Sequence, residues 1–519
     1  MLKLLAPLIA LVCAPFFTGS TAYGQNHPDH PPLVTGPGGQ IGIHGPNGRF
    51  IGIDDDPEAV LGGKLSLGAT PSNSSGSLAP PTLISFSPVG TVVHYTIPSP
   101  GNPGRALPWQ EAFLVGIPKK TGSSSLPVLV LFHGVYENEW SAYEKTDYFT
   151  LAMRRGWIVI APLGAHAHNY GIEYSQLNVE AALKALENDI APSFGANVDL
   201  DRFYAVGFSM GGGAAASFAA RHMDPSGLRF AGTVNLSGTT SLPWVHWSQE
   251  VGSLFEHPDM FGAPPDDPNV TFDYLRVSSI DLNYWNSSLG NNDIDPNTDM
   301  IRNLSRGPVL SSYCRTEDES KSMVITTLAA HEHLVDPSGL DNKKARLVIS
   351  EQKKGNPTAH HWTNLRENRV LNFLAPLSYQ NPKSGKTFST LADRDGGWHC
   401  FEVVQAVPRV FSPFRSFIKK SANSIMVTEV ENIAELKLPS PSSVGLRTSR
   451  KGQVKVLTYF FDTADGDPLK LILGEFTNQP TKVERKGIPG SWSWKKKTSE
   501  LTLDEPGTDG FVTWKITLP

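Results

Sequence analysis

The chain lacks long basic runs and a large excess of either charge. Its 519 residues hold 45 lysines and arginines against 50 aspartates and glutamates, a formal net charge of -5. The longest basic run is Lys495-Lys496-Lys497. Proteins that bind nucleic acid usually carry a basic stripe or a strongly positive domain, so we expect no nucleic-acid partner.

Cysteine is also scarce, with Cys13 near the start and Cys314 and Cys400 far apart in the later chain. Two distant cysteines are too few for a cysteine-based metal centre, and the sequence predicts no metal and no cofactor. In an exported protein a remaining pair of cysteines is usually bonded. We therefore predict a Cys314–Cys400 disulfide, with two buried thiols as the alternative.

Apolar runs long enough to span a membrane are missing, and the first residues come nearest to one. They read MLKLLAPLIALVCAPFFTGSTAYGQ, with Lys3 before an apolar stretch and small residues Ala22 and Gly24 before Gln25. This pattern is typical of a secretory signal peptide over residues 1–24. We expect an extracellular or periplasmic protein with no integral membrane segment after cleavage.

Three regions follow the predicted signal peptide. Residues 25–89 are rich in glycine, proline and serine, with a predicted hairpin around Pro46-Asn47-Gly48 and a linker up to Thr82. Residues 90–378 alternate apolar runs with helical patterns, and residues 379–519 hold short alternating strands that indicate a β-sandwich.

The middle region has the pattern of a parallel sheet covered by helices on both faces, an α/β fold. Residues 240–310 are rich in tryptophan, proline and acids and interrupt this pattern, which indicates a cap inserted between two core strands. The predicted core strands are Val128–Phe132, Trp157–Ala161, Phe203–Val206, the run of residues 230–238, Met323–Leu328 and the run of residues 345–350.

Gly207-Phe208-Ser209-Met210-Gly211 fits the pattern G-x-S-x-G between a predicted strand and a predicted helix. That setting is the nucleophile elbow, a turn so tight that side chains at the flanking positions would collide. The turn lifts the serine hydroxyl clear of the sheet, so Ser209 is the candidate nucleophile. A glycine-rich helix start without chemistry is the alternative.

A serine hydroxyl needs a base, and the oxyanion that forms on its attack needs backbone N–H donors. His360 and His361 follow the last core strand, and the His360-x-Trp362 spacing favours His360. Met210, directly after the nucleophile, and Val135, after the strand ending at Phe132, are the candidate donors. Aromatic residues expected to contact substrate are Tyr136, Trp362 and Trp285.

The stretches DLDRFYAVGFSMGGGAA, LFHG and AHHWTNL together resemble the α/β-hydrolase superfamily, over roughly residues 110–376. Within it they are most similar to secreted esterases of the poly(hydroxyalkanoate) depolymerase, feruloyl esterase and acetylxylan esterase kind. The resemblance implies an α/β-hydrolase fold, a Ser-acid-His triad in that chain order, and an acyl-enzyme mechanism.

The acid must then lie between the predicted strand Met323–Leu328 and His360. Related hydrolases commonly place it three residues before a valine and five before a proline, which favours Glu332 because of Val335 and Pro337. Aspartate is the more usual acid, so Asp336 is the alternative.

The leading functional hypothesis is a secreted serine carboxylesterase that acts on an extracellular polymer or its oligomers. A peptidase of the prolyl-oligopeptidase type would share the triad, but such enzymes usually carry a propeller first, and residues 25–90 are too few for one. A non-catalytic binding protein on a hydrolase scaffold is the third hypothesis.

Overall fold

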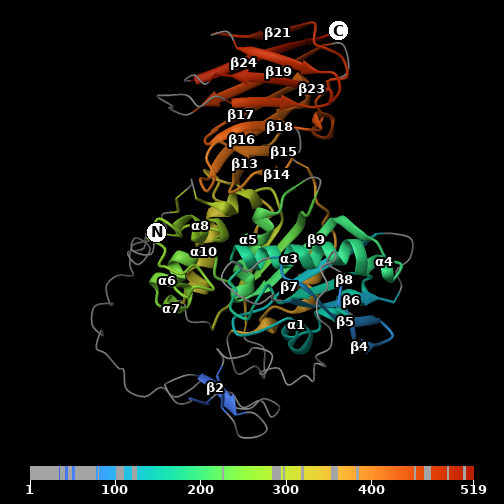
Figure 1. Cartoon of the computed structure of the whole chain (residues 1–519), viewed down its shortest axis with the longest axis vertical. Coiled ribbons are helices and arrows are strands. Elements are labelled where there is room, and N and C mark those ends of the chain that lie inside the picture. Colours follow the sequence, from blue (N-terminus) through green and yellow to red (C-terminus); the bar gives the residue numbers. More distant parts are fainter. Residues whose placement is uncertain are drawn as a thin grey trace, which may run out of the picture. The chain divides into compact units, whose positions relative to one another are not determined.

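The chain forms two compact units, residues 1–75 and 76–519, in the computed structural model (Figure 1). The predicted signal peptide, most of the linker and Trp285 lie outside the described residues. The structure describes residues 34–35, 41–44 and 50–52, and then residues 78–519 except 80, 101–109, 120–124, 225–226, 283–293, 296–297, 317–320, 352–359, 382–384, 449–451, 461–468, 488–489 and 507–509.

Three short strands form the described part of the first unit: β1 (Val34–Thr35), β2 (Ile41–His44) and β3 (Phe50–Gly52). β2 pairs antiparallel with β3, which confirms that the two apolar runs of the predicted hairpin pair, while Pro46-Asn47-Gly48 lie outside the described residues.

A nine-stranded mixed sheet organises the second unit, in the order β12-β11-β10-β9-β7-β8-β6-β5-β4. The six strands from β12 to β8 run parallel, and β6, β5 and β4 continue the sheet antiparallel. The sheet begins at Thr82, before the predicted start at residue 90. The bounds are β4 (Thr82–Phe86), β5 (Gly90–Pro98), β6 (Gln110–Pro118), β7 (Leu126–Phe132), β8 (Ile158–Pro162), β9 (Val198–Phe208), β10 (Phe230–Leu236), β11 (Val309–Cys314) and β12 (Arg346–Ser350).

Helices cover both faces of this sheet, because alternate residues of its buried strands are apolar on both sides. Val128 and Val130 of β7 belong to an apolar cluster with residues of α3, α5 and α10, while Leu129 and Leu131 belong to a second cluster with residues of α2 and α11. The helix bounds are α1 (Ser141–Lys145), α2 (Tyr148–Arg154), α3 (Glu173–Ala185), the π-turn η2 (Leu186–Ile190), α4 (Ala191–Ser193), α5 (Met210–Arg221), α10 (Ser322–Val335), the 3₁₀ turn η4 (Trp362–Asn364) and α11 (Glu367–Leu374).

The predicted strand Met323–Leu328 is wrong, because these residues lie within helix α10. The run Val324–Thr327 is rich in β-branched residues, but Thr326 donates its hydroxyl to the Ser322 carbonyl one helical turn earlier, at 2.7 Å. The core strand that sequence analysis missed is β11, Val309–Cys314. It pairs parallel with both β10 and β12.

Between β10 and β11 lies a helical insertion, within the region predicted as a cap. Several of its apolar side chains form a buried cluster with Met210, directly after the candidate nucleophile. The insertion contains α6 (Leu242–Trp247), α7 (Gly252–Phe255), α8 (Thr271–Val277) and the 3₁₀ helix η3 (Met300–Leu304).

The C-terminal region consists of two six-stranded sheets around one apolar core, in orange and red in Figure 1, as predicted for a β-sandwich. One sheet has the order β13-β16-β17-β19-β24-β21 and the other β14-β15-β18-β20-β23-β22. The bounds are β13 (Thr387–Ala392), β14 (Gly396–Trp398), β15 (Phe401–Gln405), β16 (Ser412–Lys419), η5 (Lys420–Ala422), β17 (Ser424–Thr428), β18 (Ile433–Leu438), η6 (Pro441–Val444), β19 (Gly452–Phe460), β20 (Leu469–Leu473), β21 (Lys482–Arg485), β22 (Ser491–Lys495), β23 (Glu500–Glu505) and β24 (Gly510–Leu518).

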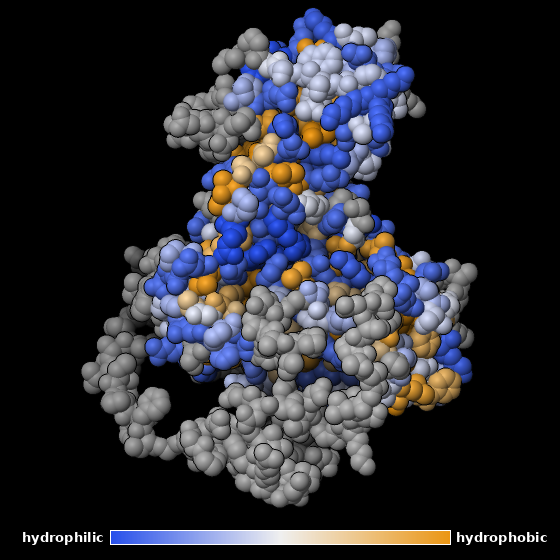
Figure 2. Space-filling view, in the orientation of Figure 1, coloured by the Kyte–Doolittle hydropathy of each residue, from blue (hydrophilic) through white to orange (hydrophobic). Residues whose placement is uncertain are grey.

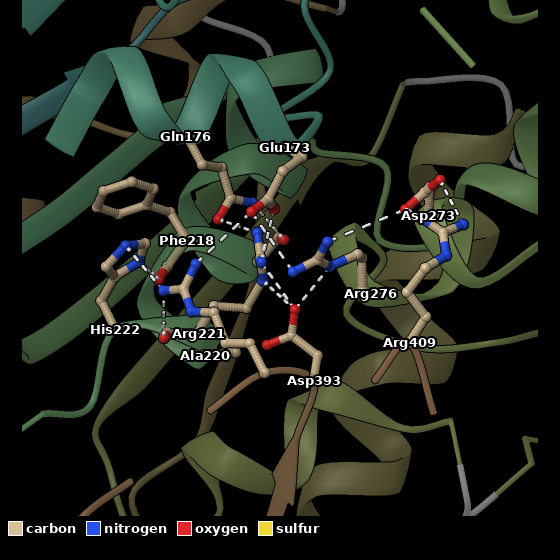
Figure 3. Close-up of polar contacts among 12 residues, drawn as sticks. Glu173, Gln176, Phe218, Ala220, Arg221, His222, Asp273, Arg276, Asp393 and Arg409 are labelled. Atoms are coloured by element: carbon tan, nitrogen blue, oxygen red, sulfur yellow. Dashed lines mark hydrogen bonds and ion pairs between the residues drawn. The ribbon is translucent and has the colours of Figure 1, made fainter. Parts of the chain in front are cut away.

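A buried ion-pair cluster joins the β-rich region to the helices of the hydrolase region (Figure 3). Asp393, just after β13, accepts from Arg221 at the end of α5 and from Arg276 of α8, each at 2.7 Å. The side chains of Asp393 and Arg221 are fully buried. Figure 2 shows a strongly hydrophilic surface in front of this junction. The two regions are therefore packed together rather than joined by a free tether.

Candidate active site

Ser209 sits at the turn between β9 and α5, in the strand–turn–helix setting that the sequence predicts. Its backbone has φ 55° and ψ -124°, a conformation that residues other than glycine rarely adopt. The Ser209 N–H donates to the Leu236 carbonyl of β10 at 2.9 Å, which fixes the turn to the neighbouring strand. A strained backbone that neighbouring elements hold in place is typical of a functional residue.

The flanking glycines have no room for side chains. A Cβ on Gly207 would lie 1.8 Å from the Gly211 carbonyl oxygen, and one on Gly211 would lie 2.1 Å from the Phe132 carbonyl oxygen. Both neighbours are backbone atoms, which cannot swing aside. The glycines therefore allow the start of α5 to pack directly against the end of β7.

His360 lies beside this turn, and its ring centroid is 4.5 Å from that of Phe208, the residue before the serine. His361 instead forms hydrogen bonds at the start of the next turn. Its Nδ1 accepts the Thr363 N–H at 3.2 Å and lies 3.0 Å from the Thr363 hydroxyl, so it caps η4. The geometry thus favours His360 over His361 as the candidate base.

The loop after β7 has three successive backbone N–H groups, of Gly134, Val135 and Tyr136, and two of them donate hydrogen bonds within the protein. The Gly134 N–H donates to Glu137 at 2.9 Å and the Tyr136 N–H donates to the Ala167 carbonyl at 2.8 Å. Within the described part of the chain, the N–H groups of Val135 and Met210 have no acceptor. The side chains of these two residues belong to one apolar cluster, which also contains residues of the helical insertion.

Two polar residues that sequence analysis missed hold this loop and the neighbouring loop after β8. His133 is buried, with Nε2 2.7 Å from the Leu163 carbonyl oxygen of the loop after β8. Glu111 of β6 is fully buried and accepts the N–H groups of Gly164 and Ala165 at 2.7 and 2.8 Å. Burial raises the pKa of Glu111 to about 8 against the opposing effect of these hydrogen bonds. The only local signal is a glutamate inside the apolar strand β6.

The acids chosen from the sequence lie elsewhere. Glu332 and Asp336 are at the end of α10, where the Asn342 N–H donates to the Leu334 carbonyl at 2.7 Å. The Asn342 side chain in turn donates to the Gly307 carbonyl, just before β11 begins. This is the amino edge of the parallel strands, whereas Ser209 follows the carboxyl end of β9. The structure therefore does not bring Glu332 or Asp336 to the elbow.

Two of the three predicted aromatic contacts can be located. Tyr136 is 74% exposed and meets His168 edge-on, with ring centroids 5.5 Å apart, so it is accessible at the rim of the elbow. Trp362 is only 1% exposed and donates its indole N–H to Glu137 at 2.8 Å. Trp362 therefore belongs to the framework of the site, and its contact with substrate stays a prediction. Trp285 is outside the described residues.

The predicted disulfide is also wrong, since Cys314 and Cys400 are both buried thiols. Cys314 ends β11, while Cys400 lies in the turn between β14 and β15 of the sandwich. Burial raises the pKa of the Cys400 thiol to about 12, which makes it a poor nucleophile.

The described ranges contain no group of three or more His, Cys, Asp or Glu side chains that could hold a metal ion. They also contain no helix long and apolar enough to cross a membrane.

No family model matches the sequence, and no curated protein does. Among solved structures the chain resembles an S-formylglutathione hydrolase from Agrobacterium tumefaciens, at 13% identity over 57% of this chain and 99% of that chain, with a TM-score of 0.39. An acetyl xylan esterase from Paenibacillus sp. R4 matches at 17% identity over 59% and 90%, with a TM-score of 0.37. An acylaminoacyl peptidase from Pyrococcus horikoshii matches at 12% identity over 57% and 43%, with a TM-score of 0.36.

These scores are too low to carry an argument, so the fold is assigned from the topology itself. A mostly parallel sheet has helices on both faces, and its central strand β9 ends in a strained serine elbow. The chain has an α/β-hydrolase fold with a helical insertion and a C-terminal β-sandwich.

Proposed function

We propose that this protein is a serine hydrolase that cleaves carboxylic esters through an acyl-enzyme. The observation that carries the proposal is the strained Ser209 at the elbow, with the His360 ring packed against the adjacent Phe208. The N–H groups of Val135 and Met210, which have no backbone acceptor among the described residues, support the proposal as candidate oxyanion donors.

In this mechanism the Ser209 hydroxyl oxygen attacks the ester carbonyl carbon while His360 takes the hydroxyl proton. The carbonyl oxygen becomes an oxyanion that accepts hydrogen bonds from Val135 and Met210. His360 then gives its proton to the departing alcohol, which leaves an acyl group on Ser209. Water, activated by the same imidazole, releases the acid and restores the serine.

The triad acid is proposed from chain order, since Glu332 and Asp336 do not reach this edge of the sheet. β11 ends at Cys314, at the same edge as the elbow, and Cys314 is in register with Ser350 at the end of β12. His360 follows β12, so an acid for it is expected after β11. The acidic run there is Glu317, Asp318 and Glu319, which lie outside the described residues.

Neutralising these acids one at a time tests the assignment. The substitutions are Glu317→Gln, Asp318→Asn and Glu319→Gln, with Glu332→Gln as a matched control. One of the three should lose on the order of 10³ to 10⁴ in kcat, and the control should stay within about tenfold of the wild type. A loss of that size in kcat for the Glu332→Gln control alone would identify Glu332 as the triad acid.

The substrate class is proposed as esters of an extracellular polymer or its oligomers, following export directed by residues 1–24. A panel of short nitrophenyl esters, feruloyl and acetyl sugar esters, polyester plates and peptide amides tests the ester preference. Ser209→Ala should abolish turnover of every ester cleaved, with a loss on the order of 10⁴ or more in kcat. Cleavage of amides without esters would instead identify a peptidase.

A further inference from the structure

One buried carboxylate lies between the two loops that carry the proposed oxyanion donor and the proposed base. It belongs to Glu137, two residues after Val135, and its side chain is 10% exposed. A buried carboxylate is costly unless donors surround it, so its contacts indicate what it stabilises.

The Glu137 carboxylate accepts from three separate segments. Oε2 accepts the Gly134 N–H at 2.9 Å and the Trp362 indole N–H at 2.8 Å. Oε1 accepts from the Lys145 ammonium of α1 at 2.7 Å. A single oxygen therefore ties the loop after β7 to the loop after β12, while Lys145 balances the charge from the more exposed side.

On the histidine side, the contact fixes the residues that place His360. Trp362 follows His360 by two positions, and its ring centroid lies 5.3 Å from that of Phe208. His360 packs on the same Phe208 ring at 4.5 Å. Holding the indole N–H therefore holds the backbone next to His360 against the elbow.

In the loop with the proposed oxyanion donor, the contacts of Glu137 leave the Val135 N–H as the one available to an oxyanion. Glu137 occupies the Gly134 N–H, and its own N–H donates to the Gly134 carbonyl at 3.2 Å, which closes a tight turn. The Tyr136 N–H is bonded to Ala167. The orientation of the Val135 N–H is thus set by bonds on both of its neighbours.

We propose that Glu137 is a positioning residue for ester hydrolysis, which holds the Val135 N–H and the His360 imidazole in one fixed arrangement around Ser209. The inference rests on the proposed function. Burial alone would raise the pKa of Glu137, but Lys145 and the hydrogen bonds from Trp362 and Gly134 lower it, so the carboxylate is ionised and accepts every one of these bonds.

Three variants separate positioning from packing. Glu137→Met keeps a side chain of similar length but removes both acceptor oxygens. Glu137→Gln keeps one oxygen able to accept from Gly134 and Trp362. Lys145→Met removes only the charge partner. Each is assayed on a short nitrophenyl ester, with kcat normalised to the sites labelled at completion by a serine-directed phosphonate.

Glu137→Met should lower kcat per labelled site about 10²-fold, with KM within about threefold, because misplacement of catalytic groups acts mainly on the transition state. Glu137→Gln should recover to within about tenfold of the wild type, and Lys145→Met should stay within about threefold.

A merely structural Glu137 would give a lower melting temperature and fewer labelled sites, but an unchanged kcat per labelled site, and that result would overturn the inference. Should Glu137→Met not fold, Trp362→Phe keeps an aromatic ring without the N–H and should lose about tenfold in kcat. An unchanged kcat in that variant would also overturn it. A wild-type protein that neither reacts with the phosphonate nor cleaves esters refutes the proposed function instead.

Discussion

Replacing Asp393 with asparagine tests how the β-sandwich is joined to the hydrolase region. Oδ2 of Asp393 accepts from Arg221 Nε at 3.0 Å, from Arg221 Nη2 at 2.7 Å and from Arg276 Nε at 2.7 Å (Figure 3). The other oxygen, Oδ1, has no hydrogen-bond partner among the described residues. An asparagine would therefore lose the charge and also bury an amide N–H group with no acceptor.

The size of the effect follows from what remains around Arg221. Removing one partner of a buried ion pair costs about 3 to 5 kcal/mol. Arg221 keeps the Glu173 carboxylate at 2.6 Å and the side-chain amide oxygen Oε1 of Gln176 at 2.7 Å, so we expect the lower end of that range. At about 2.1 cal/mol/K of unfolding entropy per residue, a loss of about 3 kcal/mol corresponds to a fall of roughly 3 °C in melting temperature for a unit that spans residues 76–519.

Scanning calorimetry of the full chain at pH 7 measures this shift. Asp395→Asn is the matched control, because Asp395 is exposed and should change stability by no more than about 0.5 kcal/mol. Adding Arg221→Met to Asp393→Asn should cost less than the sum of the two single changes, since it removes the charge left behind. An Asp393→Asn protein that melts within about 1 °C of the wild type would refute the reasoning.

The contribution of the Asp393 carboxylate to stability should depend on pH. Burial raises the pKa of Asp393, but the charges of Arg221, Arg276 and Arg394 outweigh it and hold the pKa well below its usual range. A lowered pKa contributes stability that is complete above the unfolded value, about 3.9, and is lost as pH falls below it. The difference in melting temperature from Asp393→Asn should be constant from pH 7 to pH 5 and shrink only below about pH 4. Shrinkage between pH 7 and pH 5 would contradict this assignment.

Three further predictions follow from the site. Gly207→Ala should abolish activity or folding, because its Cβ would lie 1.8 Å from a backbone oxygen. Gly307→Ala should express and turn over normally, because its Cβ would lie 3.7 Å from the Leu304 carbonyl oxygen, an ordinary contact. His360→Ala should lose on the order of 10⁴ in kcat, while His361→Ala should lose only a helix cap and keep activity within about tenfold. Alkylation of the denatured protein without reductant should modify both cysteines beyond residue 25, and a mass that shows them oxidised would restore the predicted disulfide.

Local patterns predicted the elbow and most core strands because their signals lie within a few residues. The glycines around Ser209 fix a turn by excluded volume alone, and the two continuous apolar runs at β7 and β8 have few alternatives to a buried strand. The position of His360 was also predictable from the sequence, since chain order places the expected base after the last strand.

The rest depended on contacts distant in sequence. β11 was missed because Ser311 and Ser312 interrupt its apolar run, although both are buried between neighbouring strands. The β-branched residues of α10 were predicted as a core strand instead of β11. The triad acid was therefore predicted to follow the wrong element. No local pattern connects Glu137 to Trp362, because only the folded chain brings them within hydrogen-bond distance.

Mapping the residue that a serine-directed phosphonate modifies tests the central claim most directly. The native protein is labelled, digested and analysed by mass spectrometry, with Ser209→Ala treated in parallel. The account predicts one modified peptide, with the phosphonate on Ser209, and no labelling of the variant. Labelling that persists in Ser209→Ala, or a wild-type protein that cleaves esters without reacting at Ser209, would contradict it.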